Sequence, residues 1–200
     1  MGNSKVTAVP RIESAADFAD VLAAMEASPS VEPALAAAAL FEVRKGVLTG
    51  EGPTTAGRIH FSRCIDAADT AMVHRILMAG GTAAVTRAEA DLLFDIHEAG
   101  CERSDDGAFD DLLAKAVAHH VLAATGYAVP PRATALAAST RLADWARPEL
   151  PALDGESATW LARRLRRPRH HAAALTALAA LIGAAASWSA SVAALIDFAA

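Results

Sequence analysis

The segment FDDLLAKAVAHHVLAATG, from Phe109 to Gly126, carries the clearest helical pattern in this chain. Its apolar residues recur three and four positions apart, which is the spacing of one face of an α-helix. The stripe consists of Phe109, Leu112, Leu113, Ala116, Val117, His120, Val121 and Ala124. Gly126 suits the left-handed turn that commonly follows a helix. The segment therefore predicts a long helix that begins after Ser104 or Asp105 and buries one face.

The composition extends this prediction to the rest of the chain. Ala accounts for 52 of the 200 residues, and only 5% of the residues are aromatic although 54% are hydrophobic. Ala is the strongest helix former, and a chain of this length builds one good core or two small ones. We therefore expect an all-α fold, a single-domain bundle of about eight helices.

Apolar spacing and turn residues predict further helices on both sides of this segment. Upstream we expect helices at about 14–27 and 32–48, and two that start at Asp66 and Thr86. Downstream we expect helices at about 133–145, 154–166, 170–185 and 190–199. The chain then divides into a flexible start (1–13), a helical core (14–132) and a C-terminal helical part (133–200), which either joins the core or forms a separate lobe.

The helix starts at 65 and 85 resemble each other. Asp66 with Asp69, and Thr86 with Glu89, follow the spacing of a capping box. An apolar stripe accompanies each of them: Ile65, Met72, Val73, Ile76 and Leu77 in the first, and Val85, Leu92, Leu93 and Ile96 in the second. An internal duplication and the convergence of two capped helices explain the pattern equally well.

Charge and cysteine content exclude some classes of protein. The net charge of −5 argues against a general nucleic-acid binder, which would carry a basic face. Two cysteines suggest no disulfide framework, and the N-terminal residues lack the apolar stretch of a signal peptide. We expect a reduced, cytoplasmic protein.

Residues 172–196 carry no charge and follow a basic cluster, which is the length and flank of a membrane span. Ala accounts for 12 of these 25 residues and contributes little to insertion, and SWSAS (187–191) has the composition of a helix break. We expect two buried helices here, with a membrane anchor as the alternative.

The stretch FDIHEAGCERSDDGAFDD (94–111) gathers acids between two helices, and its candidate cation ligands are Glu102, Asp105, Asp106 and Asp110. An EF-hand alignment with Gly107 at position six places Leu113 where a bidentate Glu is required. A polar connector is the simpler interpretation, because acids at a helix N-terminus interact favourably with its dipole. Asp91 and Asp95 would form a solvated face. We expect no cofactor, with a divalent cation at the four carboxylates as the alternative.

The other chemically capable side chains form no recognised motif. His97, Cys101, His119 and His120 lack the spacing of a zinc site, and a nucleophilic Cys101 would need a base and an orienting group. His120 lies on the apolar stripe, so we expect a core histidine bonded to a carbonyl, whereas His119 points off the stripe and should be solvated. The three tryptophans should pack in the core. No catalytic constellation is visible, although an enzyme with a dispersed site is not excluded.

The basic run RRLRRPR (163–169) places Arg163, Arg166 and Arg167 on one helix face. These arginines are the candidate partner-binding residues. The run is otherwise a solvated face or the salt-bridge partner of the acidic first half.

The segments IDAADTAMVHRILMAGGTAAVTRAEADLLFDIHEAG and DDLLAKAVAHHVLAATGYAVPPR resemble a group of uncharacterised bacterial helical proteins over about residues 45–132. In that group a phrase like VSRAEAELLFDLNDA precedes one like LFVKAVANHL. The chain is also distantly similar to tellurite-resistance TerB-like helical proteins, which implies metal binding and stress response. It departs at His97, where the group prefers Asn, and at its irregular acidic loop.

Three functions follow as hypotheses. The first is a non-enzymatic bacterial helical protein that acts through protein–protein interaction, with a protein partner or with itself. The second is a TerB-like cation-binding stress protein that uses residues 91–111. The third is a protein tethered to a membrane by residues 172–196.

Overall fold

The computed structural model describes residues 15–27, 33–49, 64–99, 102–103, 107–141 and 155–165. These residues form an all-α fold, as the composition predicts, with one parallel pairing of two short strands. The elements are α1 (Ala15–Ala27), α2 (Pro33–Thr49), β1 (Cys64–Ile65), α3 (Ala67–Met78), α4 (Arg87–Ala99), β2 (Glu102–Arg103), α5 (Ala108–Ala124), α6 (Arg132–Ala135) and α7 (Gly155–Leu165). The bundle of about eight helices stays a prediction for the chain as a whole.

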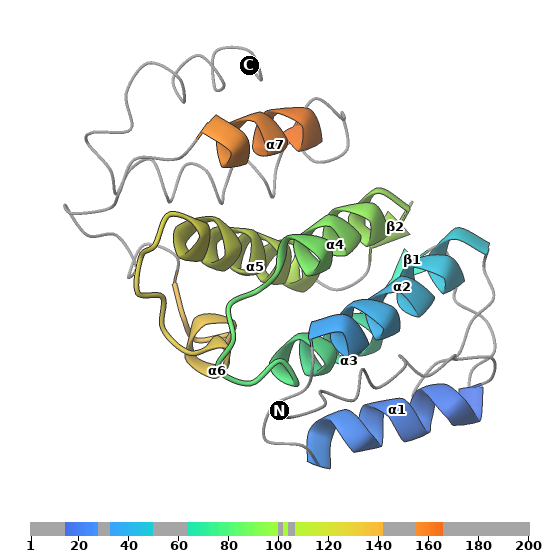
Figure 1. The fold of residues 1–200 in the computed structure, drawn as a ribbon. Helices are drawn as coiled ribbons and strands as arrows, with labels where there is room; N and C mark the ends of the chain where they lie inside the picture. The colour runs from blue at the N-terminus through green and yellow to red at the C-terminus, as the bar shows by residue number, and fades with distance from the viewer. Residues whose placement is uncertain are drawn as a thin grey trace, which may run out of the picture.

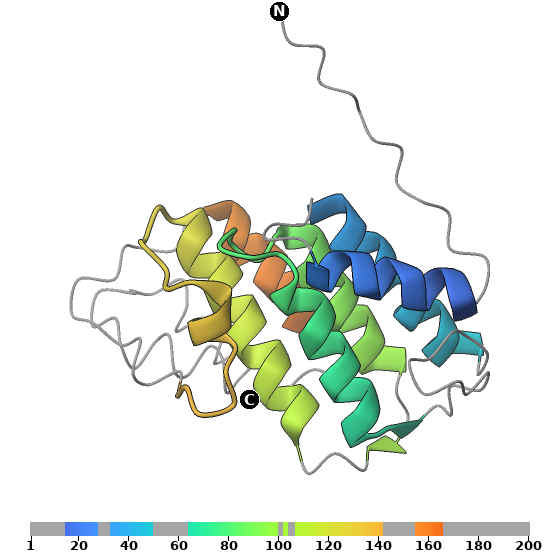
Figure 2. The same ribbon diagram turned by 90° about the horizontal axis from the view of Figure 1, so that it is seen from below.

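The core lies between four helices. α2 packs against α3 and α4, and α5 packs against the same two helices (Figure 1). α1 lies against α2, while α7 lies beside α4 and α5 (Figure 2). Every side chain of α5 from Leu112 to His119 is buried. A helix that is buried on almost all sides belongs at the centre of a fold, and α5 occupies that place.

The predicted apolar stripes face this core. The stripe residues of α3, with Ile65 before it, are all buried, as are Val85, Leu93 and Ile96 of the second stripe. The stripe of α5 is buried except for His120, which is half-buried, and Ala124, which is exposed. The periodicity of the sequence therefore identified the packed faces correctly.

Both predicted capping boxes form. The Asp66 carboxylate accepts hydrogen bonds from the N–H groups of Ala68 (2.8 Å) and Asp69 (2.9 Å), and the Asp69 carboxylate accepts one from the Asp66 N–H. At α4, the Thr86 N–H donates to Glu89 Oε2 (2.7 Å), and the Glu89 N–H donates to Thr86 Oγ1 (3.3 Å).

Glycines stand at both ends of α5. Gly126 follows the helix with φ +80°, as the sequence predicts. Gly107, with φ +81°, precedes it, so α5 begins at Ala108. Both angles fall in the left-handed region that glycine enters at low cost. The predicted start after Ser104 or Asp105 lies outside the described residues.

The predicted helix at 133–145 is wrong for its described part. α6 ends at Ala135, and residues 136–141 contain no further helix. Just beyond this end, the Nζ of the buried Lys115 donates to the carbonyls of Ala137 (2.9 Å) and Ala138 (3.4 Å). The Ala137 carbonyl also accepts a hydrogen bond from the Thr140 N–H (3.0 Å), three positions on, which is the spacing of a turn.

No helix in the described part of the chain is long and apolar enough to cross a membrane. Residues 172–196 lie outside that part, together with the N-terminal residues 1–13 and the helices predicted at 170–185 and 190–199. The membrane anchor therefore stays a prediction.

Candidate functional site

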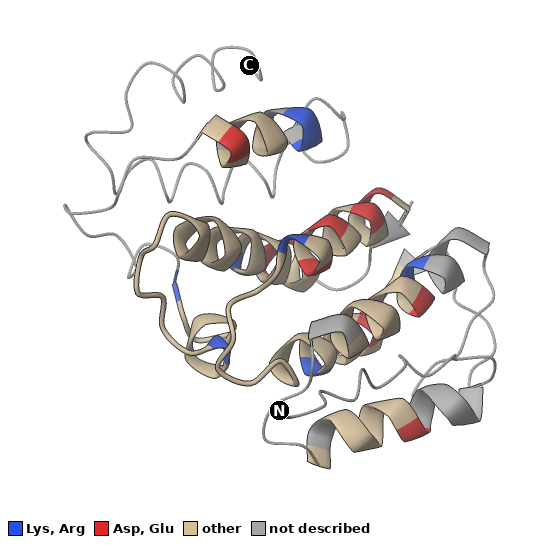
Figure 3. Ribbon diagram, in the orientation of Figure 1, with Lys and Arg blue, Asp and Glu red and all other residues tan. Residues whose placement is uncertain are grey.

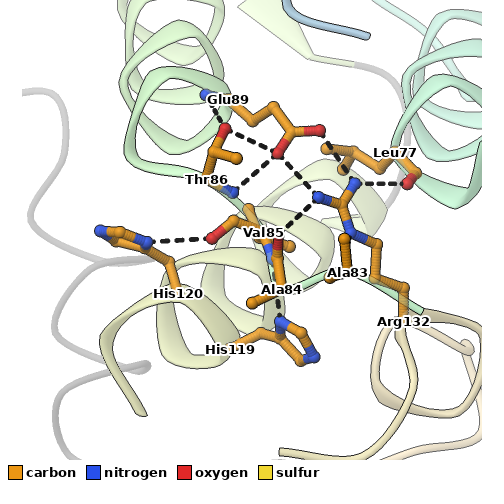
Figure 4. A network of polar contacts seen from close by, with 9 residues as sticks. All are labelled: Leu77, Ala83, Ala84, Val85, Thr86, Glu89, His119, His120 and Arg132. Atoms are coloured by element: carbon orange, nitrogen blue, oxygen red, sulfur yellow. Dashed lines mark hydrogen bonds and ion pairs between the residues drawn. The ribbon is translucent and has the colours of Figure 1, made fainter. Parts of the chain in front are cut away.

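A buried arginine joins three segments of the chain (Figure 4). Arg132 is the first residue of α6, and its side chain is fully buried. Its Nε donates to Ala83 O (2.6 Å), its Nη1 to Leu77 O (2.8 Å) and its Nη2 to Ala84 O (2.7 Å). Leu77 lies in the last turn of α3, where its carbonyl also accepts a hydrogen bond from the Gly80 N–H (3.2 Å). Arg132 therefore holds the end of α3 and the loop that follows it.

The two remaining N–H donors of Arg132 go to Glu89. Nη1 donates to Oε1 and Nη2 to Oε2, each at 2.8 Å, in the bidentate geometry that arginine and carboxylate favour. Oε2 also accepts hydrogen bonds from the backbone N–H and the hydroxyl of Thr86. One buried carboxylate thus neutralises Arg132 and caps α4.

Gly80 makes room for this guanidinium. A Cβ atom at position 80 would lie 2.1 Å from Arg132 Nη1 and 2.4 Å from its Cζ, far inside van der Waals contact. A residue with a side chain at this position would displace Arg132 from its partners. Glycine is therefore required here by the close approach of a side chain.

Two adjacent histidines of α5 hold the peptide groups on both sides of Val85. The Val85 N–H donates to His119 Nδ1 (3.2 Å), and His119 Nε2 donates to Pro130 O (2.9 Å). His120 Nδ1 donates to Val85 O (2.9 Å). Burial lowers the pKa of both imidazoles. His119 must be neutral in this arrangement, because its Nδ1 accepts the hydrogen bond from the Val85 N–H and therefore carries no proton.

These contacts correct one prediction and confirm another. His119 is fully buried, not solvated, because α5 is enclosed on the side opposite its apolar stripe as well. His120 bonds to a carbonyl as predicted, although it is half-buried.

Two acidic residues of α4 bind side chains of α7. Figure 3 shows the acids along α4 and the basic end of α7. Asp91 Oδ1 accepts hydrogen bonds from Trp160 Nε1 and Arg164 Nε, both at 2.8 Å, and Asp95 Oδ1 accepts one from Arg164 Nη1 (2.7 Å). The predicted solvated face is therefore only partly right, because α7 binds both carboxylates and leaves them partly exposed. On the other side of Asp95, Arg44 Nε lies 3.0 Å from Oδ2, without the alignment of a hydrogen bond.

The two acids stabilise the charged form of Arg164. Its partial burial disfavours that form, but the hydrogen bonds that it donates to Asp95 and Asp91, with their negative charge, outweigh burial and raise the pKa of Arg164. The salt-bridge interpretation of the basic run is therefore confirmed for this residue. Arg163 is exposed on α7, and Arg166 and Arg167 lie outside the described residues.

Trp160 packs in the core as predicted. Its ring meets Phe94 edge-on at 5.9 Å and His120 edge-on at 5.3 Å between centroids. Such pairs stabilise packing beyond the area they bury. Trp145 and Trp188 lie outside the described residues.

The predicted cation ligands are described only at Asp110. Its carboxylate lies 3.0 Å from Nε2 of the buried His97. Asp105, Asp106 and the side chain of Glu102 lie outside the described residues. Within the described part, no group of three or more His, Cys, Asp or Glu side chains is placed to hold a metal ion.

The sequence reasoning missed Arg132 and Gly80. Two signals were present: an arginine directly after Pro130 and Pro131 that opens an Ala-rich segment, and a Gly-Gly pair at the end of the first capped helix. Neither signal indicates the partner, because the contacts join segments far apart in the chain.

The outer face of α2 carries an exposed aromatic residue. Phe41 is 48% exposed, the one large hydrophobic side chain so exposed among the described residues. Ala37 and Ala38, one turn earlier, are half-buried. The three residues form an uncharged strip, called here the α2 strip.

Comparison with known proteins returns no relative. The chain matches no protein-family model, no curated protein and no solved structure. The similarity to bacterial helical proteins and to TerB-like proteins therefore stays a prediction.

Proposed function

We propose that this chain is a non-enzymatic helical protein that acts through protein–protein interaction, and that its partner is a second copy of itself bound through the α2 strip. The observation that carries the proposal is the exposure of Phe41 at 48% on a helix whose positions one turn earlier, Ala37 and Ala38, are alanines. Aromatic side chains dominate the energetics of protein interfaces, and small uncharged residues beside the ring lower the cost of removing water.

The α2 strip is complementary to itself. When two α2 helices pack antiparallel about a two-fold axis, Phe41 of each copy lies over the low surface at Ala37 and Ala38 of the other. A two-fold interface requires the same patch on both subunits. The strip supplies one large exposed side chain and two small ones within one helical turn.

The buried polar network supports this function by fixing the helices beneath α2. α2 packs against α3 and α4, and Arg132 with Glu89 joins the end of α3 to the start of α4. A surface held rigid before association loses less conformational entropy when it binds. The network thus contributes stiffness to the base on which α2 lies.

Sedimentation equilibrium of the purified chain tests the proposal. We expect a reversible dimer, and a monomer for Phe41→Ser at the same concentrations. Ala124→Ser is the matched control, because it also introduces Ser at an exposed helical position but lies at the end of α5. A wild-type chain that stays monomeric, or a Phe41→Ser chain that dimerises equally well, would refute the proposal.

A further inference from the structure

The buried and partly buried side chains of α7, among those that the structure describes, lie on one face of the helix. Ser157, Trp160 and Leu161 are buried and Arg164 is partly buried, whereas Glu156, Thr159 and Arg163 are exposed. The inward positions are i, i+3, i+4 and i+7. This spacing is the one by which an amphipathic helix binds in the groove of another protein.

The face of α4 and α5 contacts both Trp160 and Arg164, and Asp91 accepts hydrogen bonds from both of them. The Trp160 ring lies edge-on to Phe94 of α4 and to His120 of α5, and its N–H donates to Asp91. Arg164 binds Asp91 and Asp95, which lie one turn apart on α4, and its guanidinium stands 5.7 Å from the Phe94 ring centre.

The charged contacts of α7 are open to water. Side-chain exposure is 33% for Asp91, 23% for Asp95 and 16% for Arg164. Salt weakens ion pairs that water reaches and leaves buried apolar contacts largely unaffected. α5 is held differently, since its side chains from Leu112 to His119 are all buried. The attachment of α7 therefore depends more on partly exposed charges than the attachment of α5 does.

We propose that the face of α4 and α5 is a helix-binding site, which α7 occupies within its own chain. In place of α7 it accepts an amphipathic helix of a protein partner that carries an aromatic residue, an aliphatic residue and an arginine at positions i, i+1 and i+4. The acidic pair Asp91 and Asp95 selects the arginine, and Phe94 with His120 selects the aromatic ring. This surface is separate from the α2 strip, so either proposal can fail alone.

Hydrogen exchange of the full wild-type chain tests whether α7 opens by itself. We expect the α7 amides to exchange through an opening that leaves α5 protected, and to exchange faster at high salt. Exchange of α7 only together with α5, with no response to salt, would overturn the proposal.

Binding of a labelled peptide of residues 153–168 tests the site directly. The full chains to compare are wild type, Trp160→Ala and the milder Arg164→Ala, each checked for helicity. We expect the peptide to bind the variants at least about tenfold more tightly than wild type, because their own α7 competes less well at its high effective concentration.

Two controls define specificity. In the first control the peptide carries Trp160→Ala, and it should no longer bind. In the second control the Arg164→Ala chain also carries Asp91→Asn and Asp95→Asn, and it should bind the unchanged peptide more weakly. Absence of peptide binding to both folded variants would overturn the proposal. A wild-type dimer formed by exchange of α7 between copies would overturn the assignment to a separate partner.

Discussion

Arg132 and Glu89, which lie 43 positions apart in the sequence and are both fully buried, meet through two hydrogen bonds of 2.8 Å. The remaining donors of Arg132 are bound to the carbonyls of Leu77, Ala83 and Ala84. A buried ion pair stabilises a protein little when its partners could be replaced by apolar residues, but removal of one partner strands the other charge. The pair therefore specifies how α3, α4 and α6 meet.

Replacement of Arg132 by Met should destabilise the protein strongly. The change removes the guanidinium from the Glu89 carboxylate and takes one donor each from the carbonyls of Leu77, Ala83 and Ala84. Loss of one partner of a buried pair costs about 3–5 kcal/mol. Urea unfolding followed by circular dichroism measures the loss. Arg87→Met is the control, since Arg87 pairs with Glu156, which is 82% exposed. The interpretation fails if the two variants lose the same small amount of stability.

Gly80→Ala should reproduce much of this loss without touching either charge. The new methyl group would occupy the position of the Arg132 guanidinium. Gly155→Ala is the matched control, because nothing lies within 4 Å of a Cβ at that position. In the Arg132→Met background the cost of Gly80→Ala should shrink, as expected for two changes at one contact. Additive costs would mean that Gly80 serves another purpose.

Stability should fall as the pH drops below 6.5, the ordinary pKa of a histidine side chain. Burial lowers the pKa of His119 and His120 in the folded state, so the unfolded chain binds more protons between the folded pKa values and 6.5. The stability that these two neutral histidines contribute is fully present above pH 6.5. It is lost as the pH falls through their pKa values in the folded protein. Protonation would also place a donor on His119 Nδ1 against the Val85 N–H.

Denaturant unfolding at about pH 7.5 and about pH 5.5 measures this dependence. The double variant His119→Asn, His120→Asn should be less stable at the higher pH and should lose less stability between the two. An equal loss in both proteins would show that other groups cause the acid sensitivity.

The sequence predicted the features that depend on neighbouring residues along the chain. It did not predict the contacts between segments that are distant in the sequence. The capping boxes at Asp66 and Thr86 and the apolar stripes needed only local spacing. His119 appeared solvated because a helical stripe identifies one packed face, whereas α5 is enclosed nearly all round. Asp91 and Asp95 appeared solvated because nothing in their own helix indicates that Arg164 will bind them.

The end of α6 was missed for a similar reason. Its Ala-rich sequence favours a longer helix, but Lys115, more than twenty positions earlier, binds the carbonyls of Ala137 and Ala138. Tertiary contacts of this kind override helix propensity. Arg132 shows the same limit, since its role depends on carbonyls in the loop after α3.

Metal ions should leave the stability of the protein unchanged if 94–111 is a polar connector. Thermal unfolding of the EDTA-treated chain with Ca²⁺, Mg²⁺, Mn²⁺ or Zn²⁺ checks this, with Asp105→Asn, Asp106→Asn beside it. An ion bound only by the folded state would raise the unfolding temperature. A rise of several degrees with one ion, lost in the double variant, would favour the cation-binding hypothesis.

The contact between two copies of α2 is the central claim, and an isotope-filtered NOE experiment measures it most directly. A mixture of ¹³C-labelled and unlabelled chains reports only contacts between different copies. We predict cross-peaks between the Phe41 ring protons of one copy and the Ala37 and Ala38 methyl groups of the other. A dimer that shows no such cross-peaks, or a chain that remains monomeric at the concentration of the experiment, would contradict the account.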